Sequence, residues 1–231
     1  MKIVMVPGLW LNASTFDEVV PVLAEAGHEP VPLTLPGMES VESDRSGITL
    51  EDHVATVAAV LEAADDPVLL VAHSAGCGIG HAALDHHPDR VAHVVHVGGF
   101  PVADGESLLS GLEAVDGEVA MPDWAEVGEE ANIVDFTPEQ LTALYAEAIP
   151  VPERVVSDPV RLGDPRRHGI PATYLCPEYT AADLRSWVDE GELPEVGAQH
   201  SVEYVDLGGG HWPQITQPAA LAAAILATLP E

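Results

Sequence analysis

Hydrophobic residues along this chain form short continuous runs, which alternate with segments that have a helical period. Such continuous runs predict buried strands. The predicted strands are residues 2–6, 29–35, 67–73, 91–99, 171–176 and 202–207. Residues 14–26 and 218–229 predict helices, and the capping pair Thr49 and Asp52 predicts the start of another. This alternation implies an α/β fold with a mainly parallel, doubly wound sheet covered by helices on both faces.

Residues 101–168 interrupt the alternation, because this segment is much longer than one connection between parallel strands requires. Within it, Thr137, Pro138 and Gln140 form a helix start signal: a capping residue, a proline in the first turn and a capping-box partner. We therefore predict a single domain over residues 1–231, in which residues 101–168 are inserted as a mostly helical lid.

The stretch "AHSAG" places a serine at the point where a predicted buried strand turns into a helix. A tight turn of this kind projects the serine hydroxyl into open space, but it crowds the backbone two residues to either side. Those positions hold the small residues Ala72 and Gly76, so the motif is a G-x-S-x-G nucleophile elbow whose first glycine is alanine. The pattern predicts that Ser74 is a nucleophile, which needs a base to remove its proton.

Backbone N–H groups near this turn are candidates for an oxyanion hole. Ala75 follows the serine at the N-terminus of the predicted helix, where a developing negative charge is stabilised. A second donor is expected after the first strand, where a Pro-Gly turn precedes Leu9 and Trp10. We assign the Leu9 N–H to this role, with Trp10 as the alternative.

His211 is the candidate base, because it lies in the loop "GGGHWP" between the last predicted strand and the last helix. A serine followed much later by this histidine is the chain order that such an elbow requires. The closely spaced histidines His86, His87, His93 and His96 do not predict a metal site. The first two precede a proline at a helix end, and the other two face opposite sides of their strand.

A carboxylate is expected to orient the His211 ring and to stabilise its cation. In this chain order the carboxylate belongs after the strand at residues 171–176. Glu178 is our choice for it. Asp183, further along the same segment, and Asp104, in the turn after the strand at 91–99, are the alternatives.

The formal net charge of −30 arises from 38 Asp and Glu residues against 8 Lys and Arg residues. Nucleic-acid binding requires clustered cations, which this sequence lacks, and anionic membranes should repel the same surface. The inserted segment is especially acidic, since residues 101–153 contain thirteen Asp and Glu residues and no Lys or Arg. We therefore expect neutral or cationic ligands to be favoured over anionic ones.

The sequence also indicates in which cellular compartment the protein is expected. The first residues lack the long apolar segment of a signal peptide, and no run approaches the 18 apolar residues of a membrane span. The two cysteines, Cys77 and Cys176, fit isolated thiols in a reducing compartment. We expect a cytoplasmic protein.

Taken together, these motifs resemble the α/β-hydrolase family over nearly the whole chain. "VPGLW" corresponds to the oxyanion loop, "AHSAG" to the elbow, "CPEYT" to the acid loop and "GGGHWP" to the histidine loop, while "VGGFPVADGES" resembles the small esterase and hydroxynitrile-lyase-like branch. Two positions depart from the family pattern: Pro7 replaces the usual histidine, and Tyr179 stands where the family more often has the acid. A serine at the elbow also argues against haloalkane dehalogenases and epoxide hydrolases, which use aspartate there.

The resemblance implies a serine hydrolase that uses no cofactor, and we expect a carboxylesterase acting on small neutral esters. Aromatic residues that could line an apolar pocket are Trp10, Phe100, Trp124, Tyr145 and Trp212. The alternatives are a lyase or cofactor-free oxidation on the same scaffold, a ligand-binding sensor with little turnover, and an inert scaffold or interaction protein. The sequence indicates a small-molecule substrate and leaves the oligomeric state open.

Overall fold

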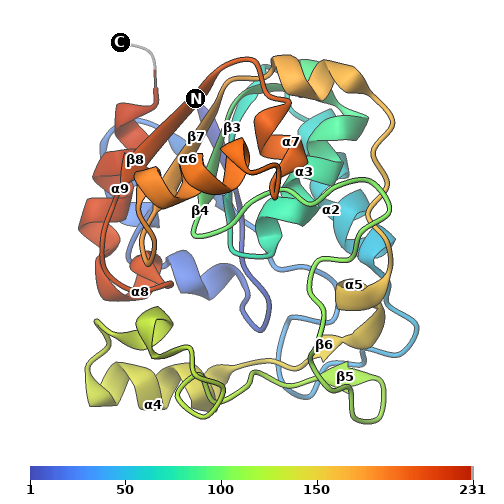
Figure 1. Cartoon of the computed structure of the whole chain (residues 1–231), viewed down its shortest axis with the longest axis vertical. Helices are drawn as coiled ribbons and strands as arrows, with labels where there is room; N and C mark the ends of the chain where they lie inside the picture. The colour runs from blue at the N-terminus through green and yellow to red at the C-terminus, as the bar shows by residue number, and fades with distance from the viewer. Residues whose placement is uncertain (230–231) are drawn as a thin grey trace.

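The computed structural model describes residues 1–229, and its centre is a six-stranded sheet in which every pairing is parallel (Figure 1). The strand order is β2-β1-β3-β4-β7-β8. The strands are β1 (Lys2–Val6), β2 (Glu29–Pro32), β3 (Val68–His73), β4 (Val91–Val97), β7 (Ala172–Cys176) and β8 (Val202–Asp206). This is the predicted α/β sheet, and the carboxyl ends of all six strands lie at the same edge.

Helices cover both faces of the sheet, as predicted. The α-helices are α1 (Val20–Glu25), α2 (Leu50–Glu62), α3 (Gly76–His86), α4 (Pro138–Glu147), α5 (Glu153–Ser157), α6 (Ala181–Asp189), α7 (Pro194–Gly197), α8 (Pro213–Thr216) and α9 (Pro218–Ala227). Four 3₁₀ turns accompany them: η1 (Ala13–Phe16), η2 (Pro88–Arg90), η3 (Glu130–Ile133) and η4 (Pro165–Gly169).

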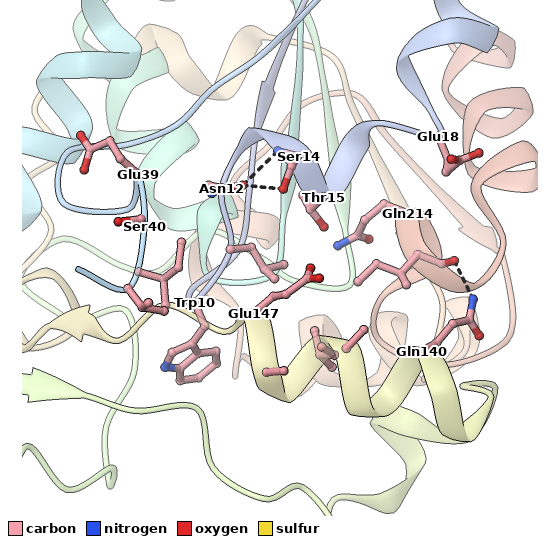
Figure 2. Close-up of a pocket in the computed structure, with 17 residues that line it drawn as sticks. Trp10, Asn12, Ser14, Thr15, Glu18, Glu39, Ser40, Gln140, Glu147 and Gln214 are labelled. Atoms are coloured by element: carbon pink, nitrogen blue, oxygen red, sulfur yellow. Dashed lines mark hydrogen bonds between the residues drawn. The ribbon is translucent and has the colours of Figure 1, made fainter. Parts of the chain in front are cut away.

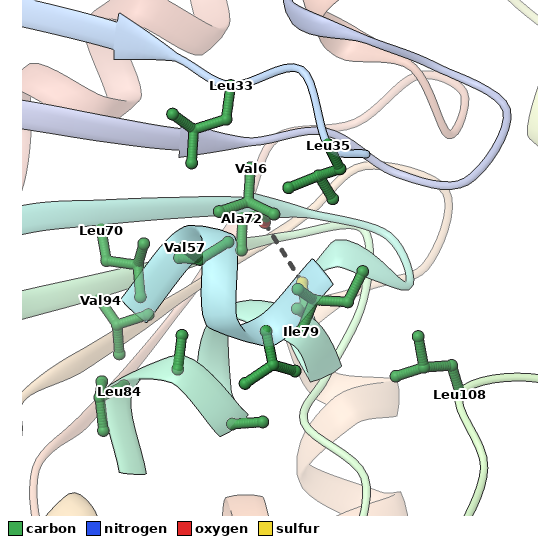
Figure 3. Packing of buried hydrophobic residues seen from close by; sticks show 14 of the residues in the cluster. Val6, Leu33, Leu35, Val57, Leu70, Ala72, Ile79, Leu84, Val94 and Leu108 are labelled. Atoms are coloured by element: carbon green, nitrogen blue, oxygen red, sulfur yellow. Dashed lines mark hydrogen bonds between the residues drawn. The ribbon is translucent and has the colours of Figure 1, made fainter. Parts of the chain in front are cut away.

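Successive side chains of each strand point to opposite faces and so enter two separate cores. On β1, Val4 and Val6 belong to the core beneath α2 and α3, whereas Ile3 and Met5 belong to the core beneath α1 and α9. Figure 3 shows Val6 of β1 and Val57 of α2 within the first of these cores. The near-continuous apolar runs of the sequence are therefore explained by burial on both faces.

The capping signals mark the helix starts correctly, but two proline effects shorten the predicted elements. Thr49 caps α2 in a complete capping box with Asp52. The helix expected over residues 14–26 is divided into η1 and α1, because Pro21 in the first turn of α1 lacks the N–H that a longer helix would need. The second predicted strand likewise ends at Pro32, on the edge of the sheet.

Residues 101–168 connect β4 to β7 and contain α4, α5 and a small antiparallel pair, β5 (Glu118–Val119) with β6 (Val151–Pro152). Figure 1 shows α4 and this strand pair together at one end of the molecule, beyond the carboxyl edge of the large sheet. Thr137 and Gln140 form the predicted capping box of α4. The β5–β6 pair was not predicted, since two-residue strands carry no periodic signal.

A buried ion cluster ties the end of this segment to the main body. Arg167 of η4 contacts the two carboxylate oxygens of Glu195 at 2.9 Å each and Asp85 of α3 at 3.1 Å. His81 and His168 lie 3.1 and 3.0 Å from the same Glu195 carboxylate. Burial opposes ionisation of Glu195, but the hydrogen bonds from His81, Arg167 and His168 hold its pKa well below the usual value. The cluster thus joins η4, α3 and α7.

Four histidines, His53, His73, His81 and His96, are buried with exposed fractions of 0 to 2%. Burial lowers the pKa of each, to about 3 for His73, because the charged imidazolium is poorly solvated in the core. In the unfolded chain the pKa of histidine is about 6.5. At a pH between the lowered pKa of the folded protein and about 6.5, the unfolded chain binds more protons than the folded protein. The contribution of each histidine to the free energy of unfolding is therefore complete above about pH 6.5 and is lost as the pH falls below that value.

We therefore expect the free energy of unfolding to fall by about 1.4 kcal/mol per pH unit for each of His73 and His96, whose pKa values lie well below 6.5, as the pH drops below about 6. Urea unfolding across this range measures the slope. Both ring nitrogens of His96 lack a hydrogen-bond partner among residues 1–229, so His96→Leu should make the slope shallower by one histidine. The exposed His86 provides the control, His86→Gln, which should not change it. An unchanged slope in His96→Leu would contradict this account.

Candidate active site

Ser74 lies in a strained turn between β3 and α3. Its φ of +54° is in the left-handed region, which a residue other than glycine rarely adopts. The Ser74 N–H donates to the Val97 carbonyl at 2.9 Å, which fixes the turn against β4. A Cβ on Gly76 would collide with the Pro7 carbonyl, and one on Gly99 would collide with the carbonyl of Ser74 itself. The glycine two positions after the serine is therefore required by its close approach to the first loop.

The structure brings Ser74, His211 and Glu178 into one hydrogen-bonded chain. The Ser74 Oγ lies 2.8 Å from His211 Nε2, and His211 Nδ1 lies 2.6 Å from Glu178 Oε1. An ionised carboxylate can only accept hydrogen bonds, so Nδ1 carries the ring proton and donates it to Glu178. This tautomer leaves Nε2 as the acceptor for the serine hydroxyl, which is the arrangement needed to remove its proton.

The three glycines before His211 each have a structural reason. Gly208 and Gly209 have φ values of +73° and +106°, in the region of positive φ that favours glycine. Gly210 lies so close to the Asn132 carbonyl that a side chain would not fit. The His211 N–H donates to that same Asn132 oxygen at 2.8 Å, so the inserted segment contacts the histidine loop directly.

The two alternative acids serve other contacts. Asp183 is the N3 residue of α6 and forms a capping box with Thr180, its Oδ2 accepting from the Thr180 N–H at 2.9 Å. Asp104 accepts from the Leu162 N–H at 2.9 Å, within the inserted segment. Of the three candidate acids, Glu178 is the one hydrogen-bonded to His211. It follows β7, where the sequence places it.

The N–H groups of Leu9 and Ala75 flank the elbow, and neither donates a hydrogen bond within residues 1–229. Ala75 is the N-cap of α3, so its N–H is at the positive end of the helix dipole. Leu9 follows Gly8, where a Cβ would lie 2.7 Å from His73 Nδ1 and 3.0 Å from the Ser74 Cβ. Trp10, the alternative donor, has a φ of +64°. Neither N–H has an acceptor among residues 1–229, as an oxyanion donor requires.

His73 supports the histidine loop, a role that the sequence analysis did not identify. Its Nε2–H donates to the His211 carbonyl at 2.8 Å, and its Nδ1 accepts from Gln214 Nε2 at 3.3 Å. Burial, together with the nearby His211, lowers the pKa of His73 to about 3, so the ring is neutral and holds one proton. Its position directly before the serine marks His73 as a residue near the site. That position does not predict its hydrogen-bond partner, the His211 carbonyl, which is 138 residues away.

Three tryptophans link the first loop, the inserted segment and the histidine loop. Trp124 packs edge-on against Trp10 with ring centroids 5.8 Å apart, and against Trp212 at 5.4 Å. Trp10 Nε1 also donates to the Val119 carbonyl at 3.0 Å. Phe100 belongs to a separate group with Tyr179 and Trp187. Edge-on aromatic pairs of this kind stabilise the packing of the three segments against one another.

Within residues 1–229, no group of three or more His, Cys, Asp and Glu side chains has an arrangement that could hold a metal ion. His93 is hydrogen-bonded to Thr173 at 2.9 Å, whereas His96 stacks on Tyr174. The two thiols are buried and unbridged, and burial raises the pKa of Cys176 to about 12 and also raises that of Cys77. Such thiols are poor nucleophiles at neutral pH.

No helix in the described part of the chain has both the length and the apolar character needed to cross a membrane. A family model described as "Alpha/beta hydrolase family" matches residues 3–224. A carbendazim-hydrolysing esterase from Nocardioides is 28% identical over 109 residues, which cover 46% of this chain and 45% of that protein. The match therefore spans less than half the length of that relative.

Solved structures resemble the whole chain. An extracellular alpha/beta-hydrolase from a Paenibacillus species, described as structurally and functionally homologous to tobacco salicylic acid binding protein 2, has a TM-score of 0.80, 18% identity and 100% coverage of both chains. A methylesterase from Arabidopsis has a TM-score of 0.73, 19% identity and 98% coverage of both chains. A pyrethroid hydrolase from Sphingobium faniae has a TM-score of 0.73 and 22% identity, covering 98% of this chain and 96% of its own.

Proposed function

This chain belongs to the alpha/beta hydrolase family, and from that premise we propose that it is a serine hydrolase that cleaves carboxylic esters through an acyl-enzyme. The observation that carries the proposal is the continuous hydrogen-bonded chain from the Ser74 hydroxyl through His211 to Glu178. The family alone does not fix the chemistry, because this fold hosts several reactions. The likeness to an esterase, a methylesterase and a pyrethroid hydrolase supports ester hydrolysis over the alternatives.

In the proposed mechanism, His211 Nε2 removes the Ser74 proton as Oγ attacks the ester carbonyl. The negative charge that develops on the carbonyl oxygen is stabilised by the N–H groups of Leu9 and Ala75. His211 then gives the proton to the leaving alcohol. It next activates a water molecule that releases the acid and regenerates the serine. Glu178 holds the ring in the productive tautomer and stabilises the imidazolium, and no step needs a cofactor.

We further propose that residues 101–168 act as a lid over this site. The contact between Asn132 and His211 and the packing of Trp124 on Trp10 and Trp212 support this role. The acidic residues of the segment disfavour anionic substrates, so small neutral esters are the substrate class that suits the site.

A fluorophosphonate probe tests the proposal, because it modifies a serine only when a base has activated the hydroxyl. We expect one probe per chain, attached to the peptide that contains Ser74, as measured by intact-protein and peptide mass spectrometry. Ser74→Ala should abolish labelling, whereas Ser14→Ala, at an exposed serine away from His211, should retain it. The proposal fails if the folded wild-type protein does not react, or if Ser74→Ala reacts as well.

A further inference from the structure

His73, the residue directly before the nucleophile, takes no part in the mechanism above, yet it connects the nucleophile's strand to the histidine loop. It is 1% exposed and is the last residue of β3, one peptide bond from Ser74. β3 is paired with β1 on one side and β4 on the other, and His73 itself is opposite Val97 of β4. The backbone of His73 is therefore fixed in the middle of the sheet.

The His73 ring has little freedom to rotate. A Cβ on Gly8 would lie 2.7 Å from its Nδ1 and 3.2 Å from its Cε1, so the backbone of the first loop packs directly against the ring. The ring also lies near that of His211, with centroids 5.1 Å apart and planes tilted by 53°. A ring held in this way makes a hydrogen bond in one fixed direction, because its rotamer is already set by packing.

Two hydrogen bonds connect this ring to both ends of the segment from His211 to Gln214. His73 Nε2 donates to the His211 carbonyl at 2.8 Å, and Gln214 Nε2 donates to His73 Nδ1 at 3.3 Å. A neutral imidazole has one N–H, so the Gln214 amide selects the tautomer with its proton on Nε2. Gln214 is 1% exposed and belongs to α8, and Figure 2 shows it beside Thr15 of η1. Gln214 thus acts on the His211 carbonyl through His73.

The peptide groups of His211 are held from two directions. Its N–H donates to the Asn132 carbonyl at 2.8 Å, and its carbonyl accepts from His73 at 2.8 Å. Residues 208–210 are all glycine and bring no side chain to hold the loop. The distance of 2.8 Å between His211 Nε2 and Ser74 Oγ therefore depends on these two bonds. The bond from His73 ties the base to the residue next to the nucleophile.

We propose that His73 and Gln214 are positioning residues. His73 holds His211 at the distance from Ser74 that proton transfer requires, and Gln214 holds His73 in the tautomer that donates. The effect on rate rests on the proposed ester hydrolysis, whereas the effect on the His211 ring does not. Neither side chain contacts the reacting atoms, so their loss should lower kcat and leave KM little changed.

Steady-state kinetics with p-nitrophenyl acetate test the role of His73. His73→Leu should lower kcat about 100-fold and keep KM within about twofold of wild type, because a displacement of about 1 Å in a reacting group has an effect of this size. His73→Gln carries an amide N–H that can reach the same carbonyl. It should recover about tenfold of the lost rate, the contribution of one hydrogen bond.

A double-variant cycle tests whether Gln214 acts through His73. Gln214→Met keeps the length of the side chain and removes its donor, so it should lower kcat about tenfold. The double variant His73→Leu/Gln214→Met should be no slower than His73→Leu alone, since the first change already removes the partner of Gln214.

His53→Leu is the matched control. His53 is 2% exposed, and its Nε2 donates to the Pro36 carbonyl at 2.9 Å. The variant therefore removes a buried histidine and an equivalent hydrogen bond to a backbone carbonyl in a different part of the fold. It should lower the temperature of thermal unfolding, as His73→Leu does, and it should retain wild-type kcat.

Proton NMR gives a measurement that needs no turnover. The His211 Nδ1 proton lies in the 2.6 Å contact with Glu178, so we expect its resonance downfield of the backbone amides and absent in His211→Ala. His73→Leu should broaden or remove this resonance, because the ring is no longer held, whereas His73→Gln and His53→Leu should keep it.

The proposal is overturned if folded His73→Leu keeps wild-type kcat and the His211 resonance, or if His53→Leu loses as much rate as His73→Leu. It is also overturned if His73→Gln is as slow as His73→Leu. Should His73→Leu not fold, wild-type kcat in Gln214→Met overturns the proposal in its place. If the wild type neither hydrolyses esters nor reacts with fluorophosphonate, and the resonance still responds as stated, the proposed function fails and the positioning of His211 by His73 stands.

Discussion

Ser74→Ala is expected to lower kcat for p-nitrophenyl acetate by about 10⁶-fold, because removal of a serine nucleophile from such a triad has effects of this size. His211→Ala should lower kcat by a similar factor, since the Ser74 hydroxyl is a weak nucleophile unless Nε2, 2.8 Å away, accepts its proton. The double variant should be no slower than either single variant, because the two groups act as one unit. Stopped assays with long incubation times measure these rates.

Two controls separate a loss of catalysis from a loss of folding. Thermal unfolding should show that Ser74→Ala is folded, since the change removes one oxygen from a half-buried side chain. Ser14→Ala should retain wild-type kcat. If Ser74→Ala keeps more than about a hundredth of wild-type kcat, the acyl-enzyme mechanism is wrong, because the oxyanion donors and binding alone leave only a small residual rate.

The parts of the fold that the sequence predicted are those governed by local rules. The four inner strands, β1, β3, β4 and β7, appear as near-continuous apolar runs because they are buried on both faces, whereas the edge strands β2 and β8 are only partly buried. The capping boxes at Thr49 and Thr137 mark helix starts because they satisfy otherwise unpaired N–H groups within four residues of the chain. The small residue at Gly76 is required by a turn that the motif itself encodes.

The capping box at the start of α6 is also encoded by local spacing. Thr180 and Asp183 have the same spacing as Thr49 and Asp52, and they form the same capping box. That spacing assigns Asp183 to the start of α6, which removes it as a competitor of Glu178. The role of Asp104 had no such signal, because its partner Leu162 is 58 residues away.

The features that the sequence did not predict depend on contacts between distant residues. The hydrogen bond from His73 to the His211 carbonyl spans 138 residues, and the packing of Trp124 between Trp10 and Trp212 joins three separate loops. A cavity beside α4 is likewise lined by four segments that no spacing rule connects (Figure 2). Such features become visible only when the chain is folded, because periodicity reports burial and not the identity of the partner.

Glu178→Gln is expected to lower kcat/KM about 10⁴-fold, the scale seen when the acid of such a triad is made neutral. Glu178 Oε1 lies 2.6 Å from His211 Nδ1. An amide carries no charge to stabilise the imidazolium, and its NH₂ group, if turned toward Nδ1, holds the ring in the wrong tautomer. The loss should therefore appear mainly in kcat, measured under substrate saturation.

Matched variants separate this effect from a general loss of negative charge. Asp183→Asn and Asp104→Asn each remove one carboxylate that contacts backbone groups away from His211. Both variants should keep kcat within about threefold of wild type. Asp183→Asn should also lower the free energy of unfolding by about 1 kcal/mol, because it disrupts the Thr180 capping box. Glu178→Asp restores the charge at a shorter reach and should recover part of the rate. If Glu178→Gln retains nearly full kcat while Asp183→Asn or Asp104→Asn loses it, His211 is oriented by a different acid in the working enzyme. Equal losses of kcat in all three amide variants would instead show that the acidic surface acts as a whole. A specific orienting contact predicts a loss only in the variant that changes the hydrogen bond to His211 Nδ1.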